Sequence, residues 1–366
     1  MADRPLRVAV DGRELTGSPT GVGRYLGALL ERWGRGDSDA PRFQVIVPRA
    51  EPAGADRFGP QVEWIVERAG RGGTAWEQTR LRQVVTRLAP DVFFAPGYTA
   101  PLALPCPLVL AVHDVSFFAH PEWYRPREGF RRRLLTRASA RQSRAIVTIS
   151  EFSRREILRY LGVPAERVHL AYCGAPPIDA DAAPSDREPL VLFVGSLFNR
   201  RHVPETIQGF ARAVEVVPDA RLVFVGDNRT SPRIEPEAMA RTLGVGTQVE
   251  WRRYVSDAEL DDLYRRARVF VFVSDYEGFA LTPAEALARG VAPILADTEV
   301  AHEIYAGGAR FVPPTPESIG RAMIELLSDA DACRRVVDKG QDAISRFSWE
   351  ECADKVAHLL AAVAAQ

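Results

Sequence analysis

Short apolar runs alternate with amphipathic stretches along most of the chain. The runs are rich in β-branched and aromatic residues and are apolar on both faces, which predicts buried strands of parallel sheet. Helical patterns between them complete the alternation that is typical of doubly wound α/β folds. The strands expected in the first half are Leu6–Val10, Phe43–Val47, Val62–Val66, Val92–Ala95, Leu108–Val112 and Ala145–Ile149.

The same pattern resumes after a segment without periodicity. Residues 173–189 are rich in Pro, Ala and Asp and predict a linker. With 366 residues, the chain is too long for one ordinary core. We therefore expect two domains, residues 1–176 and 177–348, each built on its own sheet. The strands expected in the second half end at or near Gly195, Gly226, Trp251 and Val273.

Two glutamates stand eight positions apart after the most apolar strand of the second half. Glu277 lies in a loop, and Glu285 lies in a predicted helix with Pro283 in its first turn. Such a helix points unpaired backbone N–H groups at the space above the sheet, which suits a diphosphate. We expect Glu285 in the first turn to bind a ribose and Glu277 to bind sugar hydroxyls. The alternatives are a helix-dipole carboxylate and a solvated loop residue. The residues expected to supply the N–H groups are Gly278, Phe279, Ala280 and Leu281.

Two adjacent arginines follow the first strand of the second half. Arg200 and Arg201 lie between this strand and a helix, where their guanidinium groups suit phosphate oxygens. The alternative is a pair of surface arginines, because the chain has only two lysines, Lys339 and Lys355. Strands that stop at Gly195 and Gly226 also predict places where backbone approaches a ligand or a helix.

Three loops of the first half carry further candidates. Gly21 and Gly23 follow the first strand, but the third glycine of the dinucleotide fingerprint is missing, so the loop is either a ligand-binding turn or merely flexible. His113 and Asp114 follow a buried strand, at the edge where doubly wound sheets bind ligands. The alternative for His113 is a hydrogen-bonded structural residue. Tyr98, which follows the strand Val92–Ala95, is a further loop candidate.

The string EGFALTPAEALARG, which contains Glu277 and Glu285, resembles the donor-binding signature of retaining glycosyltransferases of family 4. TISEFSRREI and the TGVGRY loop with Gly21 and Gly23 are similar to other strings of that family, so the resemblance covers nearly the whole chain. It implies the GT-B architecture, in which two Rossmann-like domains face each other across a cleft. It also implies that the loop of Gly21 and Gly23 faces the donor phosphates and that the last helix, residues 349–366, crosses back to the first domain.

The resemblance implies an activity and roles for single residues. A hexose would move from a nucleotide diphosphate sugar to an acceptor hydroxyl with retention, and mannose from GDP-mannose fits best, although UDP-linked hexoses occur in relatives. His113 would contact the transferred sugar, with Asp114 as its loop support, and Asp114 and Tyr98 would line the acceptor side. Arg200 and Arg201 would neutralise the leaving diphosphate. Ser196 stands where many relatives have another arginine, and Arg201 replaces a lysine.

The family is thought to work by front-face displacement, in which the leaving phosphate helps to deprotonate the acceptor. The loops named above contain no Asp-x-Asp motif, so neither a metal nor another cofactor is expected. The acceptor would belong to a glycan, a glycolipid or a small molecule, as in bacterial polysaccharide synthesis. The basic stretch Arg125–Arg144 is either a solvated helix face or a contact for an anionic membrane or a lipid-linked acceptor.

Composition removes several other classes. A net charge of −1 argues against a nucleic-acid binder. Four scattered cysteines indicate neither a disulfide framework nor a zinc site. Without an apolar leader or spanning segment, we expect a cytoplasmic protein, at most peripheral to the inner face of the membrane. The alternatives to a transferase are a sugar-nucleotide epimerase or hydrolase on the same fold, and a non-catalytic nucleotide-binding partner of another transferase.

Overall fold

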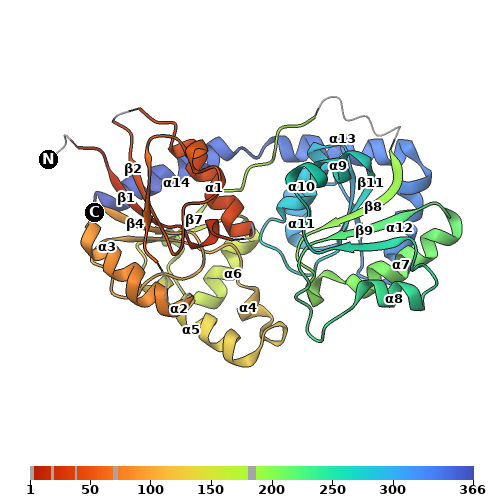
Figure 1. The fold of residues 1–366 in the computed structure, drawn as a ribbon, viewed down its shortest axis with the longest axis horizontal. Coiled ribbons are helices and arrows are strands. Elements are labelled where there is room, and N and C mark those ends of the chain that lie inside the picture. Colours follow the sequence, from red (N-terminus) through yellow and green to blue (C-terminus); the bar gives the residue numbers. More distant parts are fainter. Residues whose placement is uncertain (1–3, 18–19, 38, 69–72, 180–186) are drawn as a thin grey trace. The chain divides into compact units, whose positions relative to one another are not determined.

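The chain folds into two compact units. The computed structural model describes residues 4–17, 20–37, 39–68, 73–179 and 187–366. Unit 1 comprises Met1–Gly174 and Phe347–Gln366, and unit 2 comprises Ala175–Arg346 (Figure 1). Part of the expected linker, residues 180–186, lies outside the described residues.

Unit 1 contains a seven-stranded sheet in the order β3-β2-β1-β4-β5-β6-β7, and every neighbouring pair is parallel. Its strands are β1 (Arg7–Asp11), β2 (Arg42–Val47), β3 (Val62–Val66), β4 (Val92–Ala95), β5 (Leu108–Ala111), β6 (Ala145–Thr148) and β7 (Val168–Leu170). Its α-helices are α1 (Gly21–Trp33), α2 (Thr74–Trp76), α3 (Arg82–Leu88), α4 (Ser116–Ala119), α5 (Pro126–Gln142), α6 (Glu151–Leu161) and α14 (Trp349–Ala364).

Unit 2 contains a six-stranded parallel sheet in the order β10-β9-β8-β11-β12-β13. Its strands are β8 (Glu188–Val194), β9 (Arg221–Val225), β10 (Val249–Arg252), β11 (Ala267–Phe272), β12 (Ala292–Ala296) and β13 (Arg310–Val312). Its α-helices are α7 (Val203–Val216), α8 (Pro236–Thr242), α9 (Asp257–Arg266), α10 (Leu281–Ala288), α11 (Glu299–Tyr305), α12 (Pro316–Ser328) and α13 (Ala330–Ser345).

Both sheets confirm the predicted doubly wound α/β class. In unit 1 the strand order reverses between β1 and β4, and in unit 2 it reverses between β8 and β11. Helices that follow the two strands at such a point leave the sheet in opposite directions, so a crevice opens at the carboxyl ends of these strands. The loops after β1 and β4, and those after β8 and β11, are therefore the first places to look for ligand-binding residues.

The strands are as apolar as the sequence requires. Every residue of β4, β5, β6 and β12 is buried. Branched and aromatic side chains on both faces of these strands have no stable place except between helices, which explains why the runs form interior parallel strands. The expected helix from Trp76 to Leu88 is interrupted, because residues Glu77–Leu81 form a π-helical turn between α2 and α3.

The last helix belongs to unit 1. Figure 1 shows α14, in blue, beside the red N-terminal elements, and it packs on α1 and β4. Trp33 of α1 donates its indole N–H to the carbonyl oxygen of Ala353 at 2.9 Å, and its ring stacks on Phe43. Val356 and Leu360 of α14 are fully buried. The core of unit 1 is thus built from both ends of the chain.

Candidate active site

In unit 2, the loops after β8 and β11 are joined by an ion pair. These strands are neighbours in the sheet. Arg201, at the end of the short 3-10 turn Asn199–Arg201, places Nε 2.9 Å and Nη2 2.8 Å from Oε1 of Glu277. The hydroxyl of Ser274 donates to the same oxygen at 2.9 Å. The predicted phosphate-binding arginine and the predicted sugar-binding carboxylate therefore lie together.

The two arginines of this loop are held by more than charge. The Arg201 guanidinium lies over the ring of Phe272, 4.5 Å from its centroid, and donates from Nη1 to the carbonyl oxygen of Ser196. Arg200 donates from Nε to the carbonyl oxygen of Tyr276 at 3.1 Å. The side chains of Arg200 and Arg201 are only 13% and 11% exposed, so they are fixed cationic groups rather than freely solvated ones.

Gly195 and Gly226 owe their identity to crowding within the protein. A Cβ on Gly226 would lie 2.1 Å from the carbonyl oxygen of Gly195, and a Cβ on Gly195 would lie 2.8 Å from Nη1 of Arg201. The expectation that these glycines let backbone approach a ligand is therefore incomplete. The missing side chain of Gly195 leaves room for the guanidinium of Arg201, and that of Gly226 leaves room for the backbone of Gly195 at the end of β8.

Helix α10 begins at Leu281, four residues before Glu285. Ala280 precedes it in a left-handed conformation with φ 65°. Gly278 and Phe279 lead into this turn, so the N–H groups expected for a diphosphate lie at the start of the helix. Pro283, the third helical residue, lies in the first turn as predicted, but the prediction that Glu285 also lies there is wrong, because Glu285 is the fifth residue of the helix.

Glu285 lies in the second turn of α10 and is nearly buried, with 7% exposed. It accepts a hydrogen bond on Oε2 from the hydroxyl of Tyr264 at 3.2 Å. Each oxygen of a carboxylate can accept more than one hydrogen bond, as a contact with a diol requires. Its place in α10 is compatible with the predicted ribose contact.

A small pocket opens beside Glu277 in unit 2. Most of its lining is apolar, and its polar side chains are few, as is common in small-molecule sites. Sequence reasoning missed Ser274, which immediately follows a buried strand, and Thr298, which caps α11. The lining residues are Phe272, Ser274, Glu277, Phe279, Ala280, Leu295, Ala296, Thr298, Val300, Ala301 and Tyr305.

In unit 1, His113 follows β5 and is buried. Its hydrogen-bond partner shows that Nε2 carries a hydrogen atom. This nitrogen lies 2.7 Å from the carbonyl oxygen of Pro96, which can only accept. Burial lowers the pKa of His113 below its usual value, against the opposing effects of the Pro96 hydrogen bond and the Asp114 charge. The ring is therefore neutral at neutral pH, and Nδ1 carries a lone pair that can accept a hydrogen bond.

Asp114 and Tyr98 hold each other. The hydroxyl of Tyr98 donates to Oδ2 of Asp114 at 2.8 Å, and the backbone N–H of Ser116 donates to Oδ1 at 2.8 Å. Tyr98 has φ 66°, an uncommon conformation for a bulky residue. Its ring meets the edge of His113 with centroids 5.7 Å apart. The phenol that was expected to line the acceptor side thus supports the loop of His113 and Asp114.

The two glycines at the start of α1 differ in their surroundings. A Cβ on Gly23 would lie 2.2 Å from the carbonyl oxygen of Glu14, whereas a Cβ on Gly21 would meet no atom of the described residues within 4 Å. The backbone N–H of Gly23 donates to the hydroxyl of Thr20, which caps the helix. Packing therefore accounts for Gly23, and Gly21 is the glycine whose identity packing does not explain.

Sequence reasoning also missed a buried charged network after β1. Arg13 donates to both carboxylate oxygens of Asp11 and forms an ion pair with Glu77 at 2.5 Å. Asp11 and Glu77 are 3% and 2% exposed, and Thr99 donates to Glu77 at 2.9 Å. The signal for Asp11 was a carboxylate at the end of an apolar strand, whereas Glu77 lies in a helical stretch whose residues are mostly exposed or half-buried, so no comparable signal pointed to it.

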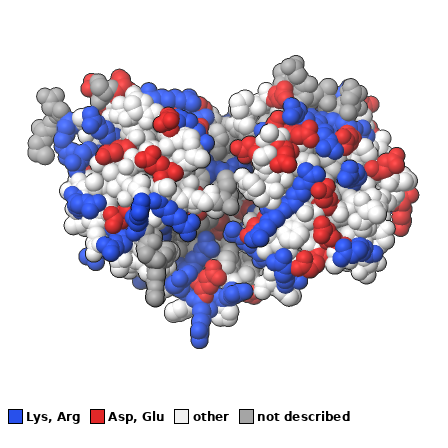
Figure 2. Space-filling view, in the orientation of Figure 1, with Lys and Arg blue, Asp and Glu red and all other residues white. Residues whose placement is uncertain are grey.

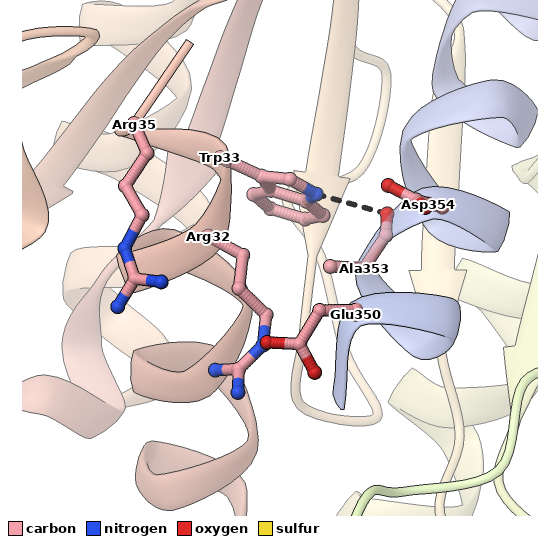
Figure 3. Close-up of a pocket in the computed structure, with 6 residues that line it drawn as sticks. All are labelled: Arg32, Trp33, Arg35, Glu350, Ala353 and Asp354. Atoms are coloured by element: carbon pink, nitrogen blue, oxygen red, sulfur yellow. Dashed lines mark hydrogen bonds and ion pairs between the residues drawn. The ribbon is translucent and has the colours of Figure 1, made fainter. Parts of the chain in front are cut away.

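A second pocket lies in unit 1, away from these loops. Figure 3 shows Trp33 pointing across it toward Ala353, with Arg32 and Glu350 forming an ion pair at 3.0 Å at its edge. It lies at the C-terminal end of α1, where Trp33 is 12 residues, or about 18 Å along the helix axis, from Gly21. Its lining residues are Arg32, Trp33, Arg35, Glu350, Ala353 and Asp354.

Comparison with solved structures supports the architecture. Sucrose-phosphate synthase from Thermosynechococcus elongatus superposes with a TM-score of 0.79 at 18% identity, covering 99% of this chain and 100% of that one. The Anabaena HepE protein in complex with UDP and glucose superposes with a TM-score of 0.74 at 17% identity, covering 98% and 100%. These likenesses confirm the expected GT-B type of fold, with two Rossmann-like domains.

Sequence comparison places both units in one family. O-antigen chain mannosyltransferase B of Escherichia coli is 27% identical over 264 residues, which cover 67% of each protein. O-antigen chain mannosyltransferase RfbU of Salmonella typhimurium is 26% identical over 239 residues, covering 65% of this chain and 63% of that protein. The model of Glycosyltransferase Family 4 matches residues 19–177, and that of Glycosyl transferases group 1 matches residues 176–343. The chain therefore belongs to the group 1 glycosyltransferases of the family 4 type.

Proposed function

We propose that this protein transfers a hexose, namely mannose from GDP-mannose, to an acceptor hydroxyl of a glycan or glycolipid. The observation that carries the proposal is the cluster of Arg200, Arg201 and Glu277 at the switch point of unit 2. The mannosyl preference rests on the two O-antigen mannosyltransferases among the relatives. Their names also suggest a growing bacterial polysaccharide as the acceptor.

The cluster suits a reaction in which negative charge grows on a leaving diphosphate. Fixed cations and aimed N–H groups stabilise such charge more in the transition state than in the ground state. Arg200, Arg201 and the N–H groups of residues 278–281 bind the diphosphate in this proposal. Glu277 accepts hydrogen bonds from sugar hydroxyls, and Glu285 accepts them from the ribose.

In unit 1 the proposal assigns one polar contact to the sugar. Nδ1 of the neutral His113 ring accepts a hydrogen bond from a hydroxyl of the hexose. Nε2 is not available for this contact, because it donates to the carbonyl oxygen of Pro96. Asp114 and Tyr98 keep the loop in place by their mutual hydrogen bond. The leaving phosphate takes the proton of the acceptor hydroxyl during front-face displacement, and the product keeps its anomeric configuration.

We also propose that catalysis requires no metal ion, because the two guanidinium groups supply the charge that a divalent cation supplies elsewhere. Activity should then be unchanged by a chelator in excess over trace metal. Loss of activity with chelator and recovery with Mg²⁺ would disprove this part of the proposal alone.

The basic stretch forms helix α5, and its outer face supports contact with an anionic membrane. Phe130 and Leu134 are 64% and 57% exposed and lie four residues apart, on the same side of the helix. Figure 2 shows blue side chains gathered at the lower edge of unit 1, where Figure 1 places α4 and α5. The exposed arginines of α5 are Arg127, Arg131, Arg137 and Arg141. Among the described residues, no helix is long and apolar enough to cross a bilayer.

A binding screen followed by an activity assay tests the function. A nucleotide sugar present at about 100 times its Kd should raise the stability of the protein by about 2.7 kcal/mol. We expect GDP-mannose to raise Tm, and Glu277→Ala to abolish turnover. Glu317→Ala is the control, because Glu317 is an exposed carboxylate of the same unit that pairs with Arg212.

The outcomes separate the alternatives. Transfer of label to an acceptor with retained configuration supports the proposal. Free hexose formed without acceptor indicates a hydrolase, and an altered sugar still attached to its nucleotide indicates an epimerase. Tight binding with no turnover under any acceptor, together with full binding by Glu277→Ala, would indicate a nucleotide-binding partner instead.

A further inference from the structure

His202 stands in an unusual backbone conformation directly after the two arginines. Its φ of 46° and ψ of 45° place it in the left-handed region, which residues with a Cβ rarely adopt. It precedes α7, and its carbonyl oxygen accepts the first hydrogen bond of that helix, from Thr206 at 2.9 Å. A histidine in this place needs a reason beyond starting a helix, because glycine or asparagine would serve the backbone as well.

The reason lies in the loop after β11. Nε2 of His202 is 2.7 Å from Oδ1 of Asp275, and Nδ1 is 3.6 Å from a carboxylate oxygen of Glu205. The backbone N–H of Asp275 donates to the carbonyl oxygen of Arg200 at 3.0 Å. Asp275 therefore contacts the arginine loop twice, once through its backbone and once through the ring of His202.

These contacts add to two others between the loop of residues 200–202 and the loop of residues 275–277. Arg200 donates to the carbonyl oxygen of Tyr276, and Arg201 pairs with Glu277. The consecutive residues 275–277 thus each hold one member of the consecutive residues 200–202. In this set His202 is the member whose charge changes near neutral pH.

We propose that His202 is a positioning residue whose protonated ring, paired with Asp275, holds Arg200 and Arg201 in the conformation that binds the donor diphosphate. This inference rests on the proposed function and adds a control by pH to it. Deprotonation removes the ion pair and leaves the arginine loop attached by fewer contacts. Donor binding then weakens as pH rises.

The charged surroundings of His202 favour its cationic form. Burial alone lowers its pKa, but the carboxylates of Asp275 and Glu205 outweigh burial and raise the pKa above its usual value. The guanidinium groups of Arg201 and Arg200, one and two residues earlier, are directed at Glu277 and at the Tyr276 carbonyl. The ion pair is therefore complete at mildly acidic pH and is lost as pH rises through the folded pKa.

The test measures the Kd of GDP-mannose by calorimetry from about pH 5 to about pH 9. Nucleotide sugars suit it, because their phosphates are diesters that do not titrate in this range. UDP-glucose replaces GDP-mannose if it is the sugar that stabilises the protein. We expect Kd to rise by about fivefold or more across the titration of His202.

Two variants test whether His202 positions Arg200 and Arg201 through its charge or only maintains the structure of the loop. His202→Asn tolerates the left-handed conformation and cannot carry charge, so its Kd should equal the high-pH wild-type value at every pH. Asp275→Asn keeps the backbone hydrogen bond to Arg200 and should move the midpoint to lower pH. His302→Asn, which removes another histidine paired with a carboxylate in unit 2, should leave the midpoint unchanged.

A flat wild-type profile overturns the inference while the proposed function stands. An unchanged midpoint in His202→Asn also overturns it, and if that variant does not fold, an unchanged midpoint in Asp275→Asn does so. Failure of every nucleotide sugar to bind at any pH overturns the proposed function together with the inference.

Discussion

Nε of Arg201 donates a hydrogen bond to Oε1 of Glu277 at 2.9 Å, and Nη2 forms an ion pair with the same oxygen at 2.8 Å. Lysine can keep the charge at position 201 but cannot reproduce this geometry. We expect Arg201→Lys to lower kcat/KM by at least about tenfold and Arg201→Met by about 100-fold or more, in line with the loss of a group that stabilises a leaving anion.

Steady-state kinetics with the donor identified by the binding screen measures these losses. Arg212→Met is the matched control, since Arg212 is an exposed arginine of the same unit paired with Glu317. Near-normal kcat/KM in Arg201→Met would remove Arg201 from the proposed mechanism.

Glu285 separates ribose binding from chemistry. We expect Glu285→Gln to weaken nucleotide-sugar binding by about tenfold, because an amide replaces one charged acceptor by a donor. Tyr264→Phe removes the 3.2 Å hydrogen bond to Glu285 and should change binding less than Glu285→Gln does. Calorimetry with the complete nucleotide sugar and with the free hexose distinguishes a ribose contact from a sugar contact. An equal loss for both ligands would contradict the ribose assignment.

The two glycines of α1 provide a matched pair for stability. A Cβ at position 23 must displace the carbonyl oxygen of Glu14, so Gly23→Ala should lower the free energy of unfolding of the unit by about 1–3 kcal/mol. Gly21→Ala meets no atom of the part of the chain that the structure describes, and it should leave stability unchanged or raise it by up to about 1 kcal/mol. Urea denaturation measures both. A stable Gly21→Ala that binds donor poorly would support a ligand contact there, whereas equal instability of the two variants would contradict this account of Gly23.

The exposed face of α5 predicts binding to anionic vesicles. Replacing Phe130 and Leu134 by serine should weaken binding to phosphatidylglycerol vesicles, because both side chains lose apolar burial in the interface. Charge reversal at Arg127 and Arg131 should weaken it further, by about 1 kcal/mol per lost charge contact. Flotation with neutral phosphatidylcholine vesicles is the control. Equal binding to neutral and anionic vesicles, or none to either, would contradict the membrane proposal.

The buried ring of His113 predicts a loss of stability in acid. Its pKa is lowered in the folded state, so below the ordinary histidine pKa of about 6.5 the unfolded chain binds a proton that the folded protein resists. The free energy of unfolding should therefore fall as pH drops from about 7 to about 5. His113→Gln should reduce this slope, as measured by urea denaturation at several pH values. An identical slope in wild type and variant would mean that His113 does not remain neutral.

Periodicity was sufficient for the fold because the interior strands are apolar on both faces. β4 and β11 could be predicted from their own residues, since no other structure buries such runs. The position of Glu285 could not, because it depends on Ala280 adopting a left-handed turn that starts α10 at Leu281. Propensity does not reveal that conformation for alanine.

The residues of the candidate site could be predicted from the sequence, but the contacts between them could not. Arg200, Arg201 and Glu277 were accessible to prediction because each follows a strand end. Their ion pair depends on β8 and β11 being neighbours, which strand order along the chain does not state. The contact between His202 and Asp275 needs both that adjacency and a left-handed histidine, and no local pattern indicates either.

The hydrogen bond between Trp33 and Ala353 joins residues 320 positions apart. During synthesis, unit 1 cannot complete its core until α14 has been made. The continuous unit 2 leaves the ribosome complete before that point. Until α14 arrives, the nascent first half exposes the apolar surface that Val356 and Leu360 later cover. In the cell, unit 2 should thus fold before unit 1, and chaperones should be needed most for the segment made first.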